Sequence, residues 1–206
     1  MRKEAGNLLM FAGAVSVLLA LLLFVHNQWE AKQAEERAAQ VVAQLEEQIA
    51  EQQEPSAAAE PEPTEESSAE PEQQPQALTV DGKTYIGYLS IPAIDLTLPV
   101  QAEWSYQGLK TAPGRYSGSA ETQDLVIAGH NYARHFTPIK WLTVGTEVDF
   151  VDTGNRVWRY QVSAVETLQP EQVDEMITPS TSWDLTLFAC TAGGGARYTV
   201  RCTAVI

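Results

Sequence analysis

The stretch LTLFACTAGGGARYTVRC, from Leu185 to Cys202, holds both cysteines of this chain and decides how its C-terminal part folds. Two runs rich in β-branched and aromatic residues flank a Gly-rich loop, which predicts an antiparallel β-hairpin. In that hairpin Cys190 lies opposite Arg197, and Cys202 lies opposite Leu185, roughly 17 Å further along the ladder. A disulfide needs Cα atoms within about 7 Å of each other, so we expect two free thiols.

The two cysteines differ in their predicted surroundings. Cys190 stands at a strand end and faces Arg197, and a nearby cation favours the nucleophilic thiolate form. Cys202 lies in mid-strand among apolar neighbours and is typical of a small core residue. Arg201 shares a face with Arg197 but lies roughly 13 Å down the strand. We therefore expect Cys190 to be a nucleophile beside Arg197, and Arg201 to be a surface or ion-paired arginine.

A thiol nucleophile needs a group that moves protons, and histidine does this most often. Of the three histidines, His26 lies at the edge of the apolar N-terminal segment, and His135 follows in NYARHF. His130 ends DLVIAGH, an apolar strand-like run followed by a loop, as LTLFAC is at Cys190. If these two strands are parallel neighbours, His130 and Cys190 meet at one edge of the sheet, but the sequence alone leaves that pairing open.

The C-terminal part, residues 77–206, is expected to be one mainly β domain. Short runs of Val, Ile, Thr, Tyr and Trp alternate with turn signals, and VDTGNRVWRY is typical of a hairpin. The helical signals are short, at 106–110, 135–141 and 170–176. These features predict a closed or nearly closed β-barrel with short helices. A domain of about 130 residues is long enough to fold alone.

Residues 1–29 are expected to form a cytoplasmic tip and a transmembrane anchor. The run from Leu8 to Val25 is almost wholly apolar, and about 20 such residues cross the hydrocarbon core of a membrane. Basic residues precede the run and Glu30 follows it, so the positive-inside rule places the N-terminus in the cytoplasm and the rest of the chain outside. A cleaved signal peptide is the alternative, but the apolar run is long and the HNQ that follows it is a poor cleavage site.

Residues 30–76 are expected to form an acidic stalk. They hold 13 acidic and 2 basic residues, a net −11 out of the chain's −14, and so acidic a chain is a poor partner for nucleic acid. Within residues 30–53, apolar residues recur at helical spacing and form one narrow stripe, Ala38, Val42, Leu45 and Ile49. We expect a solvated helix without a partner here rather than a weak coiled coil. Residues 54–76, rich in Pro, Glu and Ser, are expected to be a disordered spacer that holds the domain away from the membrane.

Four stretches of the domain, taken together, resemble the sortases, which are membrane-anchored cysteine transpeptidases of Gram-positive bacteria. YIGYLSIPAIDLTLPV resembles their first barrel strands, LVIAGHNY their catalytic histidine strand, LTLFACT their TLxTC cysteine motif, and RYTVRC the strand that begins with their catalytic arginine. The resemblance covers residues 83–206 and implies a closed β-barrel of about eight strands. The chain departs from the pattern at Ala189, where the family usually has threonine, and this puts sequence preference in question more than chemistry.

The resemblance also implies the chemistry. Cys190 would be the nucleophile, His130 the general acid/base, and Arg197 the group that stabilises the oxyanion or orients the substrate. An LPxTG-like sorting signal of a secreted protein would form a thioacyl-enzyme, which an amine then resolves. The implied partners are sorting-signal peptides and an amine acceptor, either a lipid-linked peptidoglycan precursor or a pilin lysine. We expect no cofactor, and because the sequence shows no clear carboxylate cluster that would bind calcium, we expect no metal.

Three other functions fit the sequence less well. Another cysteine acyltransferase or hydrolase, such as an L,D-transpeptidase, would carry a His-Gly-Cys cluster, and no histidine adjoins Cys190. An anchored, non-catalytic β-domain that binds peptides or the cell wall would not explain a free thiol that faces an arginine. A zinc site from His130, His135, Cys190 and Cys202 matches no usual ligand spacing.

Overall fold

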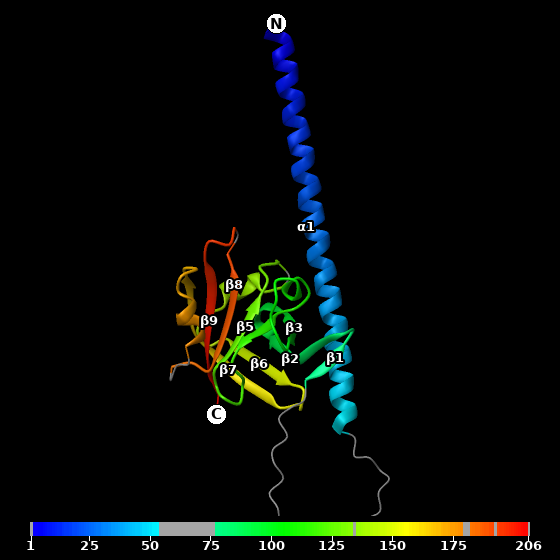
Figure 1. Ribbon diagram of the computed structural model, residues 1–206. Helices are drawn as coiled ribbons and strands as arrows, with labels where there is room; N and C mark the ends of the chain where they lie inside the picture. Colours follow the sequence, from blue (N-terminus) through cyan, green and yellow to red (C-terminus); the bar gives the residue numbers. More distant parts are fainter. Residues whose placement is uncertain (1, 54–76, 134, 179–181, 192, 206) are drawn as a thin grey trace, which may run out of the picture.

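The computed structural model describes residues 2–53, 77–133, 135–178, 182–191 and 193–205. A long helix, α1 (Arg2–Gln53), stands beside a β-barrel that is built from the rest of the described chain (Figure 1). The strands are β1 (Leu78–Val80), β2 (Lys83–Ile91), β3 (Leu96–Gln101), β4 (Gly114–Ser117), β5 (Leu125–Gly129), β6 (Glu147–Asp152), β7 (Val157–Leu168), β8 (Leu185–Cys190) and β9 (Arg197–Ala204).

Eight of these strands close into a ring. Their order is β2-β3-β4-β5-β8-β9-β7-β6, and β6 pairs back onto β2. The short β1 forms a hairpin with β2 and lies outside the ring. Closure leaves the ring without a free sheet edge, because every strand in it pairs on both sides. The structure therefore confirms the prediction of a mainly β, closed barrel of about eight strands.

Alternation along the strands separates the barrel's core from its outer face. Successive side chains of a strand point to opposite faces, and in β8 Leu185, Leu187 and Ala189 belong to the central apolar cluster. Val200 and Cys202 of the neighbouring β9 belong to the same cluster and are fully buried. The residues between them point outward, and this outer face carries the candidate site.

Short helices complete the domain; those at 108–110, 137–141 and 173–177 overlap the predicted segments, and the one at 92–94 was not predicted. The 3-10 helices are η1 (Pro92–Ile94), η2 (Gly108–Lys110) and η3 (Thr137–Trp141), and the short α-helix α2 (Val173–Ile177) precedes β8. The expected hairpin is present between β6 and β7. In its turn, the backbone N–H groups of Gly154 and Arg156 donate to the carboxylate of Asp152.

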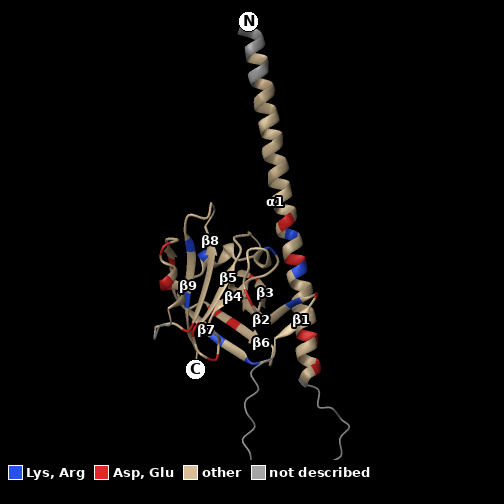
Figure 2. Cartoon of the chain, viewed as in Figure 1, with Lys and Arg blue, Asp and Glu red and all other residues tan. Residues whose placement is uncertain are grey.

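Helix α1 is one unbroken element. No Gly or Pro occurs between Gly13 and Pro55, so no helix-breaking residue interrupts it. No charged residue occurs between Ala5 and Trp29, and Figure 2 shows acidic and basic residues on the described part of α1 from near Glu30 onward. The helix is long and apolar enough to cross a membrane.

The second half of α1 has a partner, which contradicts the expectation of a solvated helix. The predicted apolar stripe is present and extends from Ala31 to Ile49 on one side of the helix. Val41, Leu45 and Ile49 form a buried cluster with residues of β1 and β2, and α1 lies along β3. The stripe was visible in the sequence, but its partner begins only at Leu78, in a separate part of the chain, and left no local signal.

The predicted spacer, residues 54–76, lies outside the described residues. The contact between α1 and the barrel is made by residues 31–49, which precede the spacer in the chain. The position of the barrel relative to the apolar half of α1 is therefore set by the helix and not by residues 54–76.

Substitution of Leu45 tests this contact. Leu45 is fully buried between α1 and the barrel, so Leu45→Ala is expected to lower the free energy of unfolding by about 2–5 kcal/mol. The measurement is chemical denaturation of a soluble form that begins at Glu30. Gln44→Ala, at an exposed neighbouring position, is the matched control and should change little; equal stability of the two variants would show that α1 does not pack on the barrel.

Candidate active site

Strands β5 and β8 bring His130 and Cys190 to the same edge of the barrel. The two strands are parallel neighbours, and Gly129 is the Cα partner of Ala189 at the end of their ladder. The next residue of each strand is His130 and Cys190, respectively. The pairing that the sequence left open is therefore present, although the two residues are 60 positions apart.

Strands β8 and β9 add Arg197 to this edge. Their antiparallel register pairs Cys190 with Arg197 and Leu185 with Cys202, as the sequence predicts. Both cysteines are free thiols. Cys190 is partly exposed, whereas Cys202 is fully buried, and this burial raises the pKa of the Cys202 thiol to about 12. The two thiols therefore have different chemistry, and only Cys190 is accessible to a substrate.

All three candidate residues lie on the outer face of the sheet. Cys190 alternates with Ala189, which is fully buried in the central core, so the side chains of these two residues point to opposite faces. The residue that departs from the sortase pattern therefore faces the core and not the face of Cys190. Arg197 shares the face of Cys190 because the two are directly opposite each other in the ladder.

The turn after β5 is built around Gly129. A Cβ atom at this position would lie 2.2 Å from the ring of Phe136, so only glycine permits this ring to pack on the strand end. The Phe136 N–H donates to the His130 carbonyl at 3.3 Å, which closes the turn. Across the edge, Asn131 Nδ2 donates to the Thr191 carbonyl at 3.2 Å and links the loops after β5 and β8. The spacing between the His130 and Cys190 loops is thus held by a direct hydrogen bond.

His130 lies in a half-buried position. Its ring stacks on Tyr132 with 4.0 Å between centroids and 13° between planes. Burial lowers the pKa of His130 below its usual range, and the positive charge of Lys110 lowers it further, while a hydrogen bond with Asn131 acts in the opposite direction. A neutral imidazole at neutral pH is ready to accept a proton.

Arg197 is oriented by its own loop. Its Nη1 donates to the carbonyls of Gly194 and Ala196, at 3.1 and 3.0 Å. The loop is tightened by a hydrogen bond from the Ala196 N–H to the Thr191 hydroxyl at 3.1 Å. Because the guanidinium carries five donors, these contacts fix its position and leave N–H groups for a substrate.

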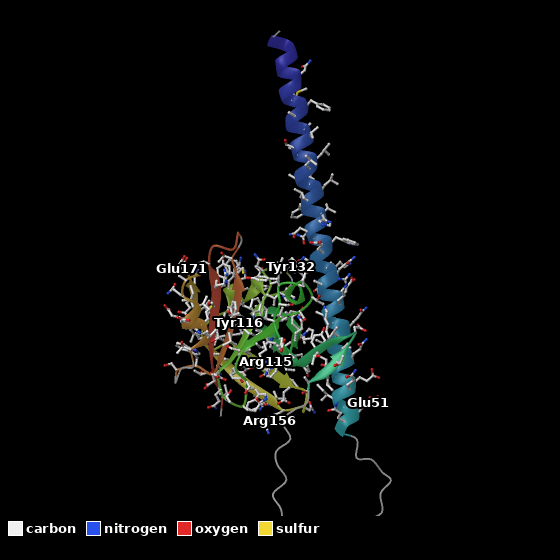
Figure 3. All side chains as sticks on the ribbon, in the orientation of Figure 1. Glu51, Arg115, Tyr116, Tyr132, Arg156 and Glu171 are labelled. Carbon is white, nitrogen blue, oxygen red and sulfur yellow. The ribbon has the colours of Figure 1, made fainter. Side chains whose placement is uncertain are left out.

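An apolar cluster on the outer face extends from these residues along the strands. We call it the outer apolar cluster; its buried members are Val126, Ala128, Leu168, Met176 and Phe188. Tyr116, labelled in Figure 3, meets the Phe188 ring edge-on at 5.3 Å and stacks on Trp104 at 5.0 Å. Phe188 and Ala128 each lie two residues before Cys190 and His130 on the same strands. Partly buried side chains, among them Trp104 and Tyr116, pack against the buried members of this cluster.

Arg201 has a structural position, as expected, but it is buried and not on the surface. Its side chain is 2% exposed and forms an ion pair with Glu166 at 2.8 Å. It also donates to the Thr186 hydroxyl at 3.0 Å and to the Glu175 carbonyl at 2.7 Å, and its guanidinium lies 4.4 Å from the Trp183 ring. These contacts join β7, β8 and β9 to the α2 segment, which forms one side of the outer apolar cluster.

The described residues do not form the zinc site that the sequence raised as an alternative. Among them, no group of three or more His, Cys, Asp or Glu side chains is arranged to hold a metal ion. Cys202 faces the core, and His135 is buried beneath the turn after β5. Burial is the main cause that lowers the pKa of His135 to about 4. A hydrogen bond with the His130 backbone raises this pKa, and the electrostatic effect of the His130 side chain lowers it.

Three neighbours of the site escaped the sequence analysis as functional candidates. Asn131 links the two loops, Tyr132 stacks on His130, and Lys110 acts on the His130 charge. Asn131 and Tyr132 follow directly in the GHNY stretch and so had a local signal. Lys110 comes from η2, and its proximity to His130 is visible only in the folded chain.

Comparisons with known proteins agree on one family. A family model described as "Sortase domain" matches residues 89–205. Sortase A from Corynebacterium diphtheriae has 25% sequence identity and a TM-score of 0.54, over 60% of this chain and 62% of that one. Sortase C1 from Streptococcus agalactiae has 27% identity and a TM-score of 0.55, over 62% of this chain and 71% of that one.

A third structure is informative for its ligand. Sortase C from Clostridium perfringens, solved with the C-terminal cell wall sorting motif, has 24% identity and a TM-score of 0.52, over 59% of this chain and 71% of that one. At that identity the likeness concerns the fold alone. A sequence comparison with curated proteins finds no match.

The contacts of Arg201 generate a stability prediction. Arg201→Ala removes an ion pair and two further hydrogen bonds, and is expected to lower the free energy of unfolding by about 2 kcal/mol. The loss of stability should be smaller than the roughly 3–5 kcal/mol that breaking a fully buried ion pair costs, because the Glu166 side chain is 41% exposed. Chemical denaturation measures it, with Arg159→Ala, on the exposed side of β7, as the control. An equal change in both variants would contradict the anchoring role.

His135 generates a prediction on pH. Its folded pKa, about 4, lies below the ordinary 6.5, so the unfolded chain binds the proton first and stability is lost as the pH falls from 6.5 to 4. A shift of this size corresponds to about 3 kcal/mol. Denaturation at pH 7 and pH 4.5 should show a smaller acid-induced loss for His135→Gln than for the unmodified protein. The same loss in both proteins would show that His135 is accessible and titrates normally.

Proposed function

The chain belongs to the sortase family, and on that premise we propose that it is a membrane-anchored cysteine transpeptidase. It cleaves an LPxTG-like sorting signal of secreted proteins through a thioacyl-enzyme and transfers the acyl group to an amine. The Clostridium perfringens relative solved with a sorting motif supports a peptide of this class as substrate. The acceptor amine belongs to a lipid-linked peptidoglycan precursor or to a pilin lysine.

The observation that carries the proposal is the pairing of β8 with β5 on one side and with β9 on the other. On one side this strand ends level with β5, next to His130, and on the other side it pairs Cys190 with Arg197. A nucleophile, a neutral base and a cation are therefore adjacent on one face, which is the set of groups that acyl transfer through a thioester requires. We assign Cys190 as nucleophile, His130 as general acid/base and Arg197 as oxyanion donor.

The first half of the reaction forms the thioacyl-enzyme. His130 accepts the proton of the Cys190 thiol, and the Cys190 sulfur attacks the carbonyl carbon of the scissile peptide bond. Negative charge moves to the carbonyl oxygen, where guanidinium N–H groups of Arg197 donate charge-assisted hydrogen bonds. The C–N bond then breaks, and His130 returns its proton to the leaving amine.

The second half transfers the acyl group. An incoming amine attacks the thioester carbonyl while His130 accepts the proton that the amine loses. The Cys190 sulfur leaves, and a new amide bond forms to the acceptor. The lowered pKa of His130 suits this step, because a neutral imidazole is present to activate the amine at neutral pH.

The proposed location follows from α1. We assign its apolar segment, residues 8–25, as a single membrane span with a cytoplasmic N-terminus, because Arg2 and Lys3 precede the segment. The barrel then lies outside the cell, where sorting signals and wall precursors are accessible.

Substitutions at the site test the proposal in a soluble form that begins at Glu30 and so keeps the helix that packs on the barrel. LPxTG-like peptides are incubated with and without an added amine, and products and acyl-enzyme are followed by mass spectrometry. Cys190→Ala should abolish both the acyl-enzyme and cleavage. Arg197→Ala should lower kcat/KM by about 10²–10³, the usual effect of losing one oxyanion donor, with partial rescue by Arg197→Lys.

Two control variants separate chemistry from folding. Cys202→Ala removes the buried thiol and should leave activity largely unchanged. Arg201→Ala should cost stability but, where the protein is folded, less activity than Arg197→Ala. Full activity of Cys190→Ala, or a greater loss of activity from Arg201→Ala than from Arg197→Ala at equal folded fraction, would refute the assignment of roles.

A further inference from the structure

The barrel contacts α1 immediately after the apolar segment ends. Ala31 and Ala34 are only 3% and 5% exposed, whereas Val25 and Trp29 are exposed on the same helix. At about 1.5 Å per residue, Ala31 lies about 9 Å beyond Val25. The headgroup layer on each side of a bilayer is about 5–7 Å thick. A barrel attached at Ala31 therefore begins where the headgroup layer ends.

The end of the barrel that carries the candidate site is turned toward the apolar half of α1. In Figure 2 the β8–β9 loop rises to the height at which the first charges of α1 appear. Figure 3 shows Tyr132 at this end, beside α1, and Arg156 at the opposite end. The charge of Glu30 contributes, after burial, to a raised pKa of Tyr132, and Tyr132 stacks on His130. The site and the end of the apolar segment are thus at one level.

Two basic side chains lie near the site, although the chain as a whole is acidic. Lys110 is close enough to act on the charge of His130, and Lys140 Nζ lies 5.5 Å from the ring of Tyr198, the neighbour of Arg197. Near a membrane surface, each cation gains about 1 kcal/mol from anionic headgroups. These two lysines would therefore be attracted to anionic headgroups.

We infer that α1 holds the Cys190–His130–Arg197 site against the outer surface of the membrane, so that the lipid headgroups form one wall of the site. The inference rests on the proposed function in one respect, since it takes α1 as the membrane anchor. It narrows the substrates to peptides and amines whose reacting groups lie close to the headgroups. A motif displayed far from the membrane is out of reach.

Distances to lipid test the orientation without any use of activity. The full chain with Cys190→Ala is placed in vesicles that contain anionic lipids, and a fluorophore is attached at Gly195→Cys in the β8–β9 loop, where a side chain meets open space. Arg156→Cys, exposed at the far end, is the matched control. Energy transfer to a headgroup-labelled lipid should be strong from residue 195 and weak from residue 156. Equal transfer, or stronger transfer from residue 156, would overturn the inference.

A helical insertion tests the consequence for substrates. Seven residues, Ala-Glu-Ala-Ala-Lys-Ala-Glu, inserted between Trp29 and Glu30 add about two turns and about 10 Å, and so lift the barrel with little rotation. In the active full chain the insertion should lower cleavage of a vesicle-tethered LPxTG-like peptide with a short spacer by at least about tenfold. A peptide with a long spacer and a free peptide should be cleaved as before. Equal cleavage of the short-spacer peptide by both proteins would overturn the inference.

The two tests separate this inference from the proposed function. If no variant cleaves any of the peptides, the proposed transpeptidase fails, whereas the energy-transfer result still decides the orientation. If free peptide is cleaved but residues 195 and 156 transfer energy equally, the enzyme assignment stands and the orientation is wrong.

Discussion

The parallel pairing of β5 with β8 is the constraint on which the site depends. Parallel strands end at the same edge, so the loops after Gly129 and Ala189 leave the sheet side by side. A parallel pair also needs a long crossover, and here that crossover contains η3, β6, β7 and α2. The segment that permits the pairing therefore supplies two of the eight barrel strands, β6 and β7, and β6 closes the ring by pairing with β2.

Strand alternation then assigns opposite roles to similar residues. Cys190 and Cys202 lie on adjacent strands, yet one is accessible at the outer face and the other is buried in the core. Arg197 and Arg201 share the outer face but lie four residues apart, and Arg201 is covered by the α2 segment and held by Glu166. The same ladder thus separates an accessible pair, Cys190 and Arg197, from groups that hold the fold together.

The sequence predicts well the features that depend on neighbours along the chain. The β8–β9 register follows from a short loop and strand alternation, and the β6–β7 hairpin from its turn residues. Features that join distant segments were predicted only in part. The β5–β8 pairing was conditional, and the contacts of Arg201 with Glu166, Glu175 and Trp183 come from residues with no local pattern. The stripe on α1 was periodic and therefore visible, but periodicity does not name the partner that covers it.

In the proposed membrane-anchored enzyme, helix α1 determines how the barrel is held. A disordered spacer would leave the barrel free to rotate and to move away from the membrane, whereas an uninterrupted helix buried along residues 31–49 fixes both height and tilt relative to the apolar segment. In the proposed reaction, two reactants that are also held at the membrane would meet the site with little translational and rotational freedom left to lose, and pre-ordering of this kind lowers the entropic part of a two-substrate barrier. The same rigidity has a cost, since a site at a fixed height selects its substrates by their distance from the bilayer as well as by their sequence.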